Sequence, residues 1–144
     1  MSLSDATIDP EQLTGAWILH RVLLGHGGRV RPMPGCTWNG LLLYTADRHF
    51  SATLSVSVGP LRKAIAYAGT FEIDDVPSDT GAARVLHDAA VATLPLRPGR
   101  TQRRIARLRH DPTVLTLTAA WRGWAMDLAW TRPDSGARHR GDAS

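Results

Sequence analysis

An arginine and a glutamine on one short segment are well suited to bind or polarise a ligand oxygen. Residue types alternate along Thr101–Arg109, which is typical of a strand whose successive side chains point to opposite faces. One face of this segment carries three arginines, which are Arg103, Arg107 and Arg109. That face must be solvated, so Gln102 and Arg104 should point to the inner face.

An inward Arg104 requires an anionic partner, because an unpaired buried charge is very unfavourable. Two acidic residues of the chain, Glu72 and Asp127, are candidates for that partner. The alternative is a carboxylate or an enolate on a bound ligand. We therefore treat Arg104 as the first candidate catalytic residue, with Gln102 beside it as a ligand-binding residue.

A histidine on an otherwise apolar face is the second candidate catalytic residue. His87 alternates in phase with three apolar residues, which are Val85, Ala89 and Val91. An imidazole ordinarily titrates near neutral pH, so His87 could move a proton. The alternative is a core histidine whose hydrogen bonds are satisfied within the protein.

Aromatic residues supply the other candidate ligand contacts. Tyr44 and Tyr67 could donate hydrogen bonds to a ligand carbonyl, and Phe50 lies on the apolar face of its segment. Trp124 starts an alternating face that continues with Met126, Leu128 and Trp130. This face either packs in the core or forms a stacking wall for a polycyclic or polyene ligand. Trp38 lies in an irregular segment and could act as a lid.

The spacing of the reactive residues argues against several kinds of site. The histidines show no HxH or HExxH spacing, so we predict no metal site. There is no G-x-S-x-G motif, phosphate loop or dinucleotide fingerprint, and we expect no cofactor. Cys36 is the sole cysteine, which excludes an intrachain disulfide and suits a reducing compartment. We interpret it as an inert thiol.

Eight alternating segments are expected to position these residues. In the clearest of them, His49–Val58, the apolar residues all fall on one face. The other seven are Ala16–Leu24, Gly40–Thr45, Lys63–Ile73, Ala83–Leu94, Thr101–Arg109, Val114–Trp121 and Trp124–Arg132. Short connections rich in Gly, Pro and Asp favour antiparallel pairing of neighbours. Closure would remove both sheet edges, so the sequence predicts an all-β, eight-stranded antiparallel up-and-down barrel around a lumen.

The ends of the chain and one connection depart from this alternation. Ile8–Leu13, with an Asp before a Pro, predicts a short helical turn. Val30–Asn39 contains two prolines and a glycine and is expected to cross one mouth irregularly. Trp17 should plug the closed end, although the phase of the first strand leaves open whether His20 faces the lumen. We predict an N-terminal arm over 1–12, the barrel over 13–132 and a disordered tail over 133–144.

Bulk properties limit the class of protein and its partners. The 144 residues, 43 % of them hydrophobic, suit one domain. No apolar run approaches the roughly 20 residues that cross a bilayer, and no signal peptide is evident, so we expect a cytoplasmic protein outside the membrane. The net charge of +4 comes mainly from arginines clustered in 97–109 and 132–140. Without a recognition helix or stacking aromatics, we do not expect nucleic-acid binding. Whether the chain forms a homodimer is left open by the sequence.

An ordered series of short motifs gives the chain a resemblance to a known family. The motifs are Thr14–Trp17 (TGAW), Gly40–Asp47 (GLLLYTAD), Ala66–Glu72 (AYAGTFE), Val85–His87, Gly99–Arg104, Leu115–Leu117 and Leu128–Arg132 (LAWTR). From about Leu13 to Arg132 the chain resembles the bacterial lipocalin-like domain proteins. It departs from them where Ala16 replaces a threonine or serine and Arg48 replaces a hairpin glycine. The resemblance implies the barrel and a lumen ligand, but little about a reaction, because such folds host many functions.

Three hypotheses of function follow from these observations. The first is a barrel that binds an apolar polyketide- or terpenoid-like metabolite, as a carrier or while reshaping it. The second is a cofactor-independent cyclase or isomerase, in which Arg104 with His87 or a tyrosine polarises a carbonyl or moves a proton. The third is a basic interaction module that uses the outer arginine face on an acidic partner.

Overall fold

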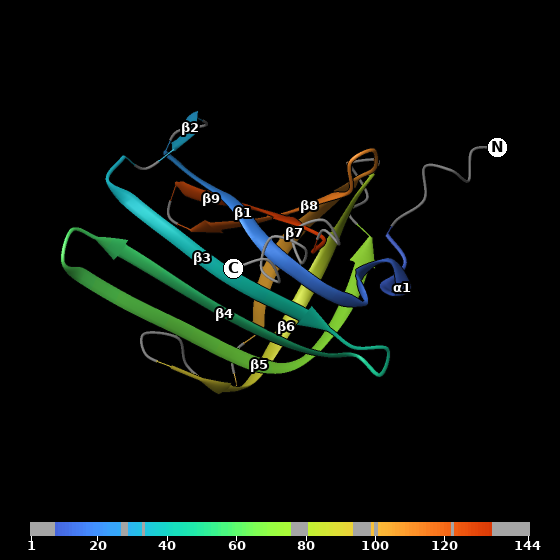
Figure 1. Cartoon of the computed structure of the whole chain (residues 1–144). Coiled ribbons are helices and arrows are strands. Elements are labelled where there is room, and N and C mark those ends of the chain that lie inside the picture. Colours follow the sequence, from blue (N-terminus) through green and yellow to red (C-terminus); the bar gives the residue numbers. More distant parts are fainter. Residues whose placement is uncertain are drawn as a thin grey trace, which may run out of the picture.

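A single antiparallel sheet closes on itself to form a barrel (Figure 1). The computed structural model describes residues 8–26, 29–32, 34–75, 81–93, 99, 101–121 and 123–133. The strands within these ranges are β1 (Gly15–His26), β2 (Arg29–Pro32), β3 (Cys36–Tyr44), β4 (His49–Val58), β5 (Leu61–Asp75), β6 (Ala82–Ala92), β7 (Thr101–Arg109), β8 (Val114–Trp121) and β9 (Trp124–Thr131). From β3 to β9 each strand pairs with the next, and β1 pairs with both β3 and β9.

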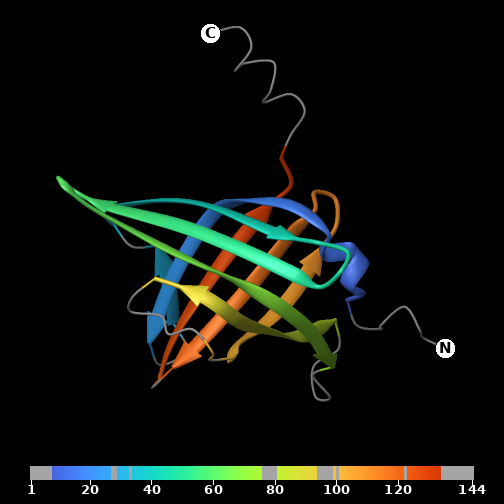
Figure 2. The same cartoon turned by 90° about the horizontal axis from the view of Figure 1, so that it is seen from below.

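The predicted eight-stranded antiparallel barrel is therefore confirmed, and β2 is a short addition to it. The four residues of β2 pair with the last part of β1, beyond the stretch that pairs with β3. Figures 1 and 2 agree that α1 (Pro10–Leu13) and the β3–β4 turn lie at one end of the barrel, whereas β2 and the β4–β5 turn lie at the other. We call these ends the closed end and the mouth.

The predicted helical turn is confirmed and covers the closed end. Asp9 precedes α1, and its backbone N–H donates a hydrogen bond to Gln12 Oε1 over 2.8 Å. Leu13 ends the helix and is fully buried. No helix in the described part of the chain is long and apolar enough to span a membrane.

Trp17 plugs the closed end, as the sequence predicts. The side chain is fully buried, and its indole N–H donates a hydrogen bond to the Leu13 carbonyl oxygen over 2.8 Å. The Arg132 guanidinium lies 3.7 Å from the centroid of the Trp17 ring. Gly15 makes this approach feasible, because a Cβ there would lie 2.9 Å from a guanidinium nitrogen of Arg132. The φ of +115° at Gly15 is also one that glycine adopts readily.

The barrel is filled by side chains in the half next to the closed end. The largest fully buried residues there are Trp17, Trp130, Tyr44, Phe71, Leu42 and Leu115. They come from the alternating inner faces of β1, β3, β5, β8 and β9, and they form one apolar cluster. The alternation predicted for His49–Val58 holds in the first part of β4, since Phe50 and Ala52 belong to the same cluster. Val58, at the mouth end of the strand, is 49 % exposed.

Two register shifts change which residues face the core. The β1–β9 register shifts between Leu19 and Arg21, and His20 is exposed. The β5–β6 register shifts between Ala68 and Gly69, and Val91 is 67 % exposed. The expectation that Val91 shares the buried face of His87 is wrong, because one extra residue on β6 reverses the phase.

The segment Val30–Asn39 is not the irregular crossing that its prolines predict. β2 occupies its start, and β3 begins at Cys36 after a turn in which Gly35 has a φ of +80°. Pro32 is tolerated because β2 pairs with β1 alone among the described strands, and an edge strand needs no donor on its free side. Trp38 is therefore part of a wall strand rather than of an irregular segment.

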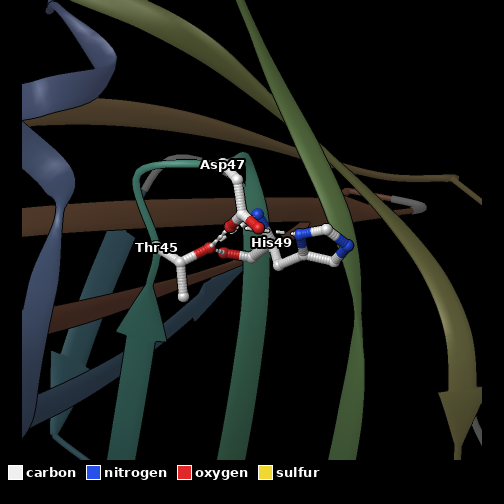
Figure 3. A network of polar contacts seen from close by, with 3 residues as sticks. All are labelled: Thr45, Asp47 and His49. Atoms are coloured by element: carbon white, nitrogen blue, oxygen red, sulfur yellow. Dashed lines mark hydrogen bonds and ion pairs between the residues drawn. The ribbon is translucent and has the colours of Figure 1, made fainter.

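A polar network fixes the turn between β3 and β4 (Figure 3). The Thr45 hydroxyl donates to the Asp47 carboxylate, and His49 Nδ1 lies 3.3 Å from Asp47 Oδ1. Hydrogen bonds from Thr45, and then from His49, lower the pKa of Asp47. Arg48 stands at the position of the family's hairpin glycine, and its φ is +70°. All four residues are exposed, so we interpret the network as a turn-stabilising element.

Several predicted segments fall partly outside the described residues. Residues 1–7 of the predicted arm and residues 134–144 of the predicted tail are not among them, and neither is Leu94.

Candidate functional site: the lumen cavity

A cavity of about 350 Å³ opens inside the barrel on the mouth side of the packed core. We call it the lumen cavity. Its lining residues are Trp38, Leu54, Ile65, Tyr67, Gln102, Arg104, Ala119, Ala120, Met126 and Leu128. They come from six of the barrel strands, β3, β4, β5, β7, β8 and β9. Most of the wall is apolar, and the polar exceptions are Tyr67, Gln102 and Arg104.

Strand alternation delivers Gln102 and Arg104 to this cavity, as the sequence predicts. Both side chains line it, while the arginines of the opposite face of β7 are exposed. Ala106, two residues further along the same inner face, is fully buried in the core. The inner face of β7 therefore lines the cavity with its first two inward residues and joins the apolar core at the third.

The predicted protein partners of Arg104 do not reach the lumen. Asp127 accepts a hydrogen bond from the Thr118 hydroxyl over 2.8 Å, and it lies between the inward residues Met126 and Leu128 on the opposite face of β9. Glu72 is exposed next to the buried Phe71. The expectation that Glu72 or Asp127 pairs with Arg104 is wrong, because both lie at outward positions of their strands.

Arg104 has no acidic partner within the part of the chain that the structure describes. Its Nη1 donates a hydrogen bond to the backbone carbonyl of Arg103 over 2.9 Å. This contact satisfies one donor of a group that carries five. The Arg104 side chain is half-buried and lines the cavity. Its remaining donors and its positive charge are therefore available to a ligand in the cavity.

A buried tyrosine–histidine pair forms the floor beneath the cavity. The Tyr44 hydroxyl and His87 Nε2 are 2.7 Å apart, and His87 is fully buried. The Phe50 ring stacks on the imidazole, with centroids 4.2 Å apart and planes 18° apart. Tyr67 meets the imidazole edge-on at 5.9 Å and also lines the cavity. Tyr67 therefore contacts the buried pair and the cavity at the same time.

The same burial holds both members of the pair in their neutral forms. Burial, and then the positive charge of Arg104, lowers the pKa of His87 to about 3. Burial, and then Tyr67, raises the pKa of Tyr44 well above its ordinary value, against an opposing effect of Arg104. His87 Nδ1 has no hydrogen-bond partner, whichever tautomer is present. An imidazole with so low a pKa is a weak base at neutral pH, so in the ligand-free barrel His87 is a neutral hydrogen-bonding group.

The eight residues singled out from the sequence divide into three groups. Four of them line the lumen cavity, namely Trp38, Tyr67, Gln102 and Arg104. Three lie in the packed floor, namely Tyr44, Phe50 and His87. Trp124 lies outside both groups. It is 41 % exposed at the mouth, where its ring meets His26 edge-on at 4.7 Å.

Trp124 does not line the lumen cavity because of its position along β9. It shares a strand face with Met126 and Leu128, which line the cavity, and with the buried Trp130. It is, however, the first residue of the strand, one step beyond the cavity. Alternation predicts the face of a residue correctly but gives no measure of its depth in the barrel.

Several cavity residues were not singled out as ligand contacts from the sequence. Ile65 alternates in phase with Tyr67, which is the signal that could have identified it. Ala119 alternates in phase with the buried Leu117, but a small side chain carries no chemical signal of its own. Trp38 adds an unpredicted feature, since its indole Nε1 is buried without a hydrogen-bond partner.

Among the described residues, no three His, Cys, Asp or Glu side chains are placed to hold a metal ion. The lumen cavity contains none of these residue types in its lining.

No family model, curated protein or solved structure matched the chain. The resemblance to bacterial lipocalin-like domain proteins stays a prediction based on the motifs quoted above, and the site is interpreted from its own geometry.

Proposed function

We propose that the barrel binds an apolar small molecule of polyketide- or terpenoid-like type, with a carboxylate, enolate or carbonyl oxygen at Arg104. The observation that carries the proposal is an arginine that lines an apolar lumen cavity and forms no ion pair with the described residues. A half-buried cation without a partner is unfavourable unless a ligand supplies one. The single cysteine supports a cytoplasmic location for this binding.

The size and lining of the lumen cavity support a small-molecule ligand. Ligand pockets commonly measure about 300–1,000 Å³ and combine apolar walls with a few polar groups that fix orientation. The cavity, at about 350 Å³, lies near the lower end of that range. Gln102 and Tyr67 flank Arg104 as the polar groups of the wall. The buried indole N–H of Trp38 is one further donor that a ligand oxygen would satisfy.

Arg104 should contribute most of the discrimination between ligands. A guanidinium forms paired, charge-assisted hydrogen bonds with a carboxylate. Hydrogen bonds to charged groups contribute about 1.5–3 kcal/mol, which corresponds to a roughly 10- to 150-fold change in affinity. Replacing Arg104 should therefore weaken the binding of an acid much more than the binding of its neutral ester.

A fluorescence titration tests this proposal. Trp38 lines the lumen cavity, so a ligand there should quench tryptophan emission. The panel contains polyketide, terpenoid and fatty acids, each with its methyl ester. We expect saturable quenching by the acids. Arg104→Gln should lower the affinity for an acid about tenfold or more, and the outer-face variant Arg103→Gln should leave that affinity unchanged. Equal losses in both variants, or no saturable quenching by any acid, would contradict the proposal.

A cofactor-independent isomerase or cyclase is a second candidate. It is favoured by Arg104 and Tyr67 lining the same cavity, where both could polarise one carbonyl. An anion held by Arg104 would also offset the charge that lowers the pKa of His87. Chromatography of the bound material separates the candidates. A product of identical mass and altered retention time, absent with Arg104→Gln, supports the enzyme, and an unchanged ligand supports a carrier.

A further inference from the structure

A second pocket lies at the mouth, separate from the lumen cavity but adjoining it. This mouth pocket has a volume of about 470 Å³ and shares no lining residue with the lumen cavity. Its lining residues are Leu24, Gly25, His26, Arg29, Arg31, Pro32, Pro34, Cys36 and Trp124. Leu24 pairs directly with Met126, which lines the lumen cavity. The two pockets are therefore lined by directly paired residues of β1 and β9.

The short strand β2 contributes two arginines to the mouth pocket. Arg31 pairs with Leu24, and Arg29 pairs with His26. Directly paired residues of antiparallel strands project to the same face, so both arginines share the inner face of β1. His26 in turn pairs with Trp124. The mouth thus combines two cations, an imidazole and an indole on one continuous face.

The described lining of the mouth pocket is basic. None of its lining residues is acidic. Within the described residues neither Arg29 nor Arg31 forms an ion pair. Exposed arginines need no partner, but two of them next to an aromatic wall are suited to hold an anionic group and the apolar chain attached to it.

We propose that the mouth pocket is a second anion subsite, in which Arg29 and Arg31 bind a terminal carboxylate or phosphate of the ligand. The inference rests on the proposed function, since the body of that ligand lies in the lumen cavity with its other oxygen at Arg104. Arg31 pairs with Leu24 of β1, whereas Arg104 lies on β7, and β8, β9 and β1 separate β7 from β2. The backbones of the two sites are thus four strand spacings apart around the wall, at about 4.8 Å each. We therefore expect two separate anionic groups of the ligand to occupy them. The ligand class is therefore an apolar chain or ring system with an oxygen function near each end.

Three matched ligands separate the two sites. Sebacic acid carries a carboxylate at each end of an apolar chain, its monomethyl ester carries one, and its dimethyl ester carries none. We expect the diacid to bind about tenfold tighter than the monoester at low salt, because only the diacid can occupy both sites as an anion. The variant Arg29→Gln with Arg31→Gln should abolish this advantage and leave monoester binding by Arg104 in place.

The sole cysteine gives an independent readout of occupancy. Cys36 lines the mouth pocket and is partly exposed, so its alkylation by iodoacetamide reports on access to this pocket. Sebacic acid should slow alkylation in the wild-type protein but not in the Arg29→Gln, Arg31→Gln variant. The control variant is Arg103→Gln with Arg109→Gln, which removes the same charge from the outer face. It should retain both the affinity advantage and the protection.

The outcomes distinguish this inference from the proposed function. Monoester binding that depends on Arg104, with no effect of the mouth variant on the diacid, would overturn the mouth subsite and leave the lumen proposal standing. Equal effects of the mouth and outer-face variants would also overturn it, since charge alone would explain them. Absence of any binding would overturn both. Replacing one carboxylate of the diacid by a phosphonate then shows which anion the arginine pair prefers, because only the preferred anion retains the full advantage.

Discussion

Acidification should destabilise the barrel through His87, because this histidine is buried in its neutral form. Burial and the charge of Arg104 hold the pKa of His87 at about 3, against an ordinary value of 6.5. Below about pH 6.5 the unfolded chain takes up a proton on this residue that the folded barrel does not. The stability that His87 contributes is thus complete above pH 6.5 and is lost as the pH falls toward 3.

The magnitude follows from the difference between the two pKa values. Each pH unit in this window costs at most about 1.4 kcal/mol for one proton. Between about pH 7 and about pH 4 the loss from His87 alone amounts to about 3 kcal/mol. The free energy of unfolding of a typical domain is about 5–15 kcal/mol, so this loss is a large fraction of it.

The test compares urea unfolding of the wild type and His87→Gln across this pH range. A glutamine amide can still bond to the Tyr44 hydroxyl but does not titrate. We expect the free energy of unfolding of the wild type to fall by about 3 kcal/mol more than that of the variant between about pH 7 and about pH 4. Background effects, such as protonation of Asp47, cancel in this difference.

Two controls make the result specific. Tyr44→Phe removes the hydrogen bond but leaves His87 buried, and it should keep the acid sensitivity because burial is the larger cause of the low pKa. His20→Gln replaces an exposed histidine and should leave the wild-type pH dependence in place. Parallel curves for wild type and His87→Gln, within about 0.5 kcal/mol, would refute the assignment of His87 as a buried neutral imidazole.

Three further predictions concern stability and are checked by urea unfolding at neutral pH. Arg48→Gly should stabilise by about 0.5–1 kcal/mol, since a φ of +70° strains an arginine; any loss of stability would contradict this. Arg132→Ala should lower the free energy of unfolding by about 2 kcal/mol, because it removes the contact with the Trp17 ring and two hydrogen bonds to backbone carbonyls. A loss below about 0.5 kcal/mol would show that the contact contributes little to stability. Gly69→Ala should cost about 3 kcal/mol or more, because its Cβ would lie 1.9 Å from the Asp88 carbonyl oxygen; a near-neutral result would mean that this bulge is not as tight as described.

Much of the fold could be predicted because inward and outward residues alternate with a period of two. Along β4 and β7 this period is uninterrupted, and the inward positions of Phe50, Gln102 and Arg104 were correctly predicted. It fails where one strand carries an extra residue, as at Val91, since a bulge leaves little trace in the sequence. The prolines before β3 were misleading because an edge strand tolerates them.

The candidate site was less predictable because depth and partners depend on the tertiary structure. Trp124 has the correct phase for the lumen but lies at the mouth, 41 % exposed. Glu72 was considered as a partner of Arg104 from its type alone, yet it lies at an outward position. The role of β2 was not predicted either, since nothing in its sequence indicates that Arg29 and Arg31 share a face with His26.

The most direct test of the central claim is a crystal structure of the barrel with a bound apolar carboxylic acid, such as decanoic acid. The account predicts that the carboxylate lies within about 3 Å of the Arg104 guanidinium. The apolar chain should contact Trp38 and Met126, which both line the lumen cavity. A lumen free of ligand at saturating concentration, or an acid bound only to the outer arginines of β7, would contradict it.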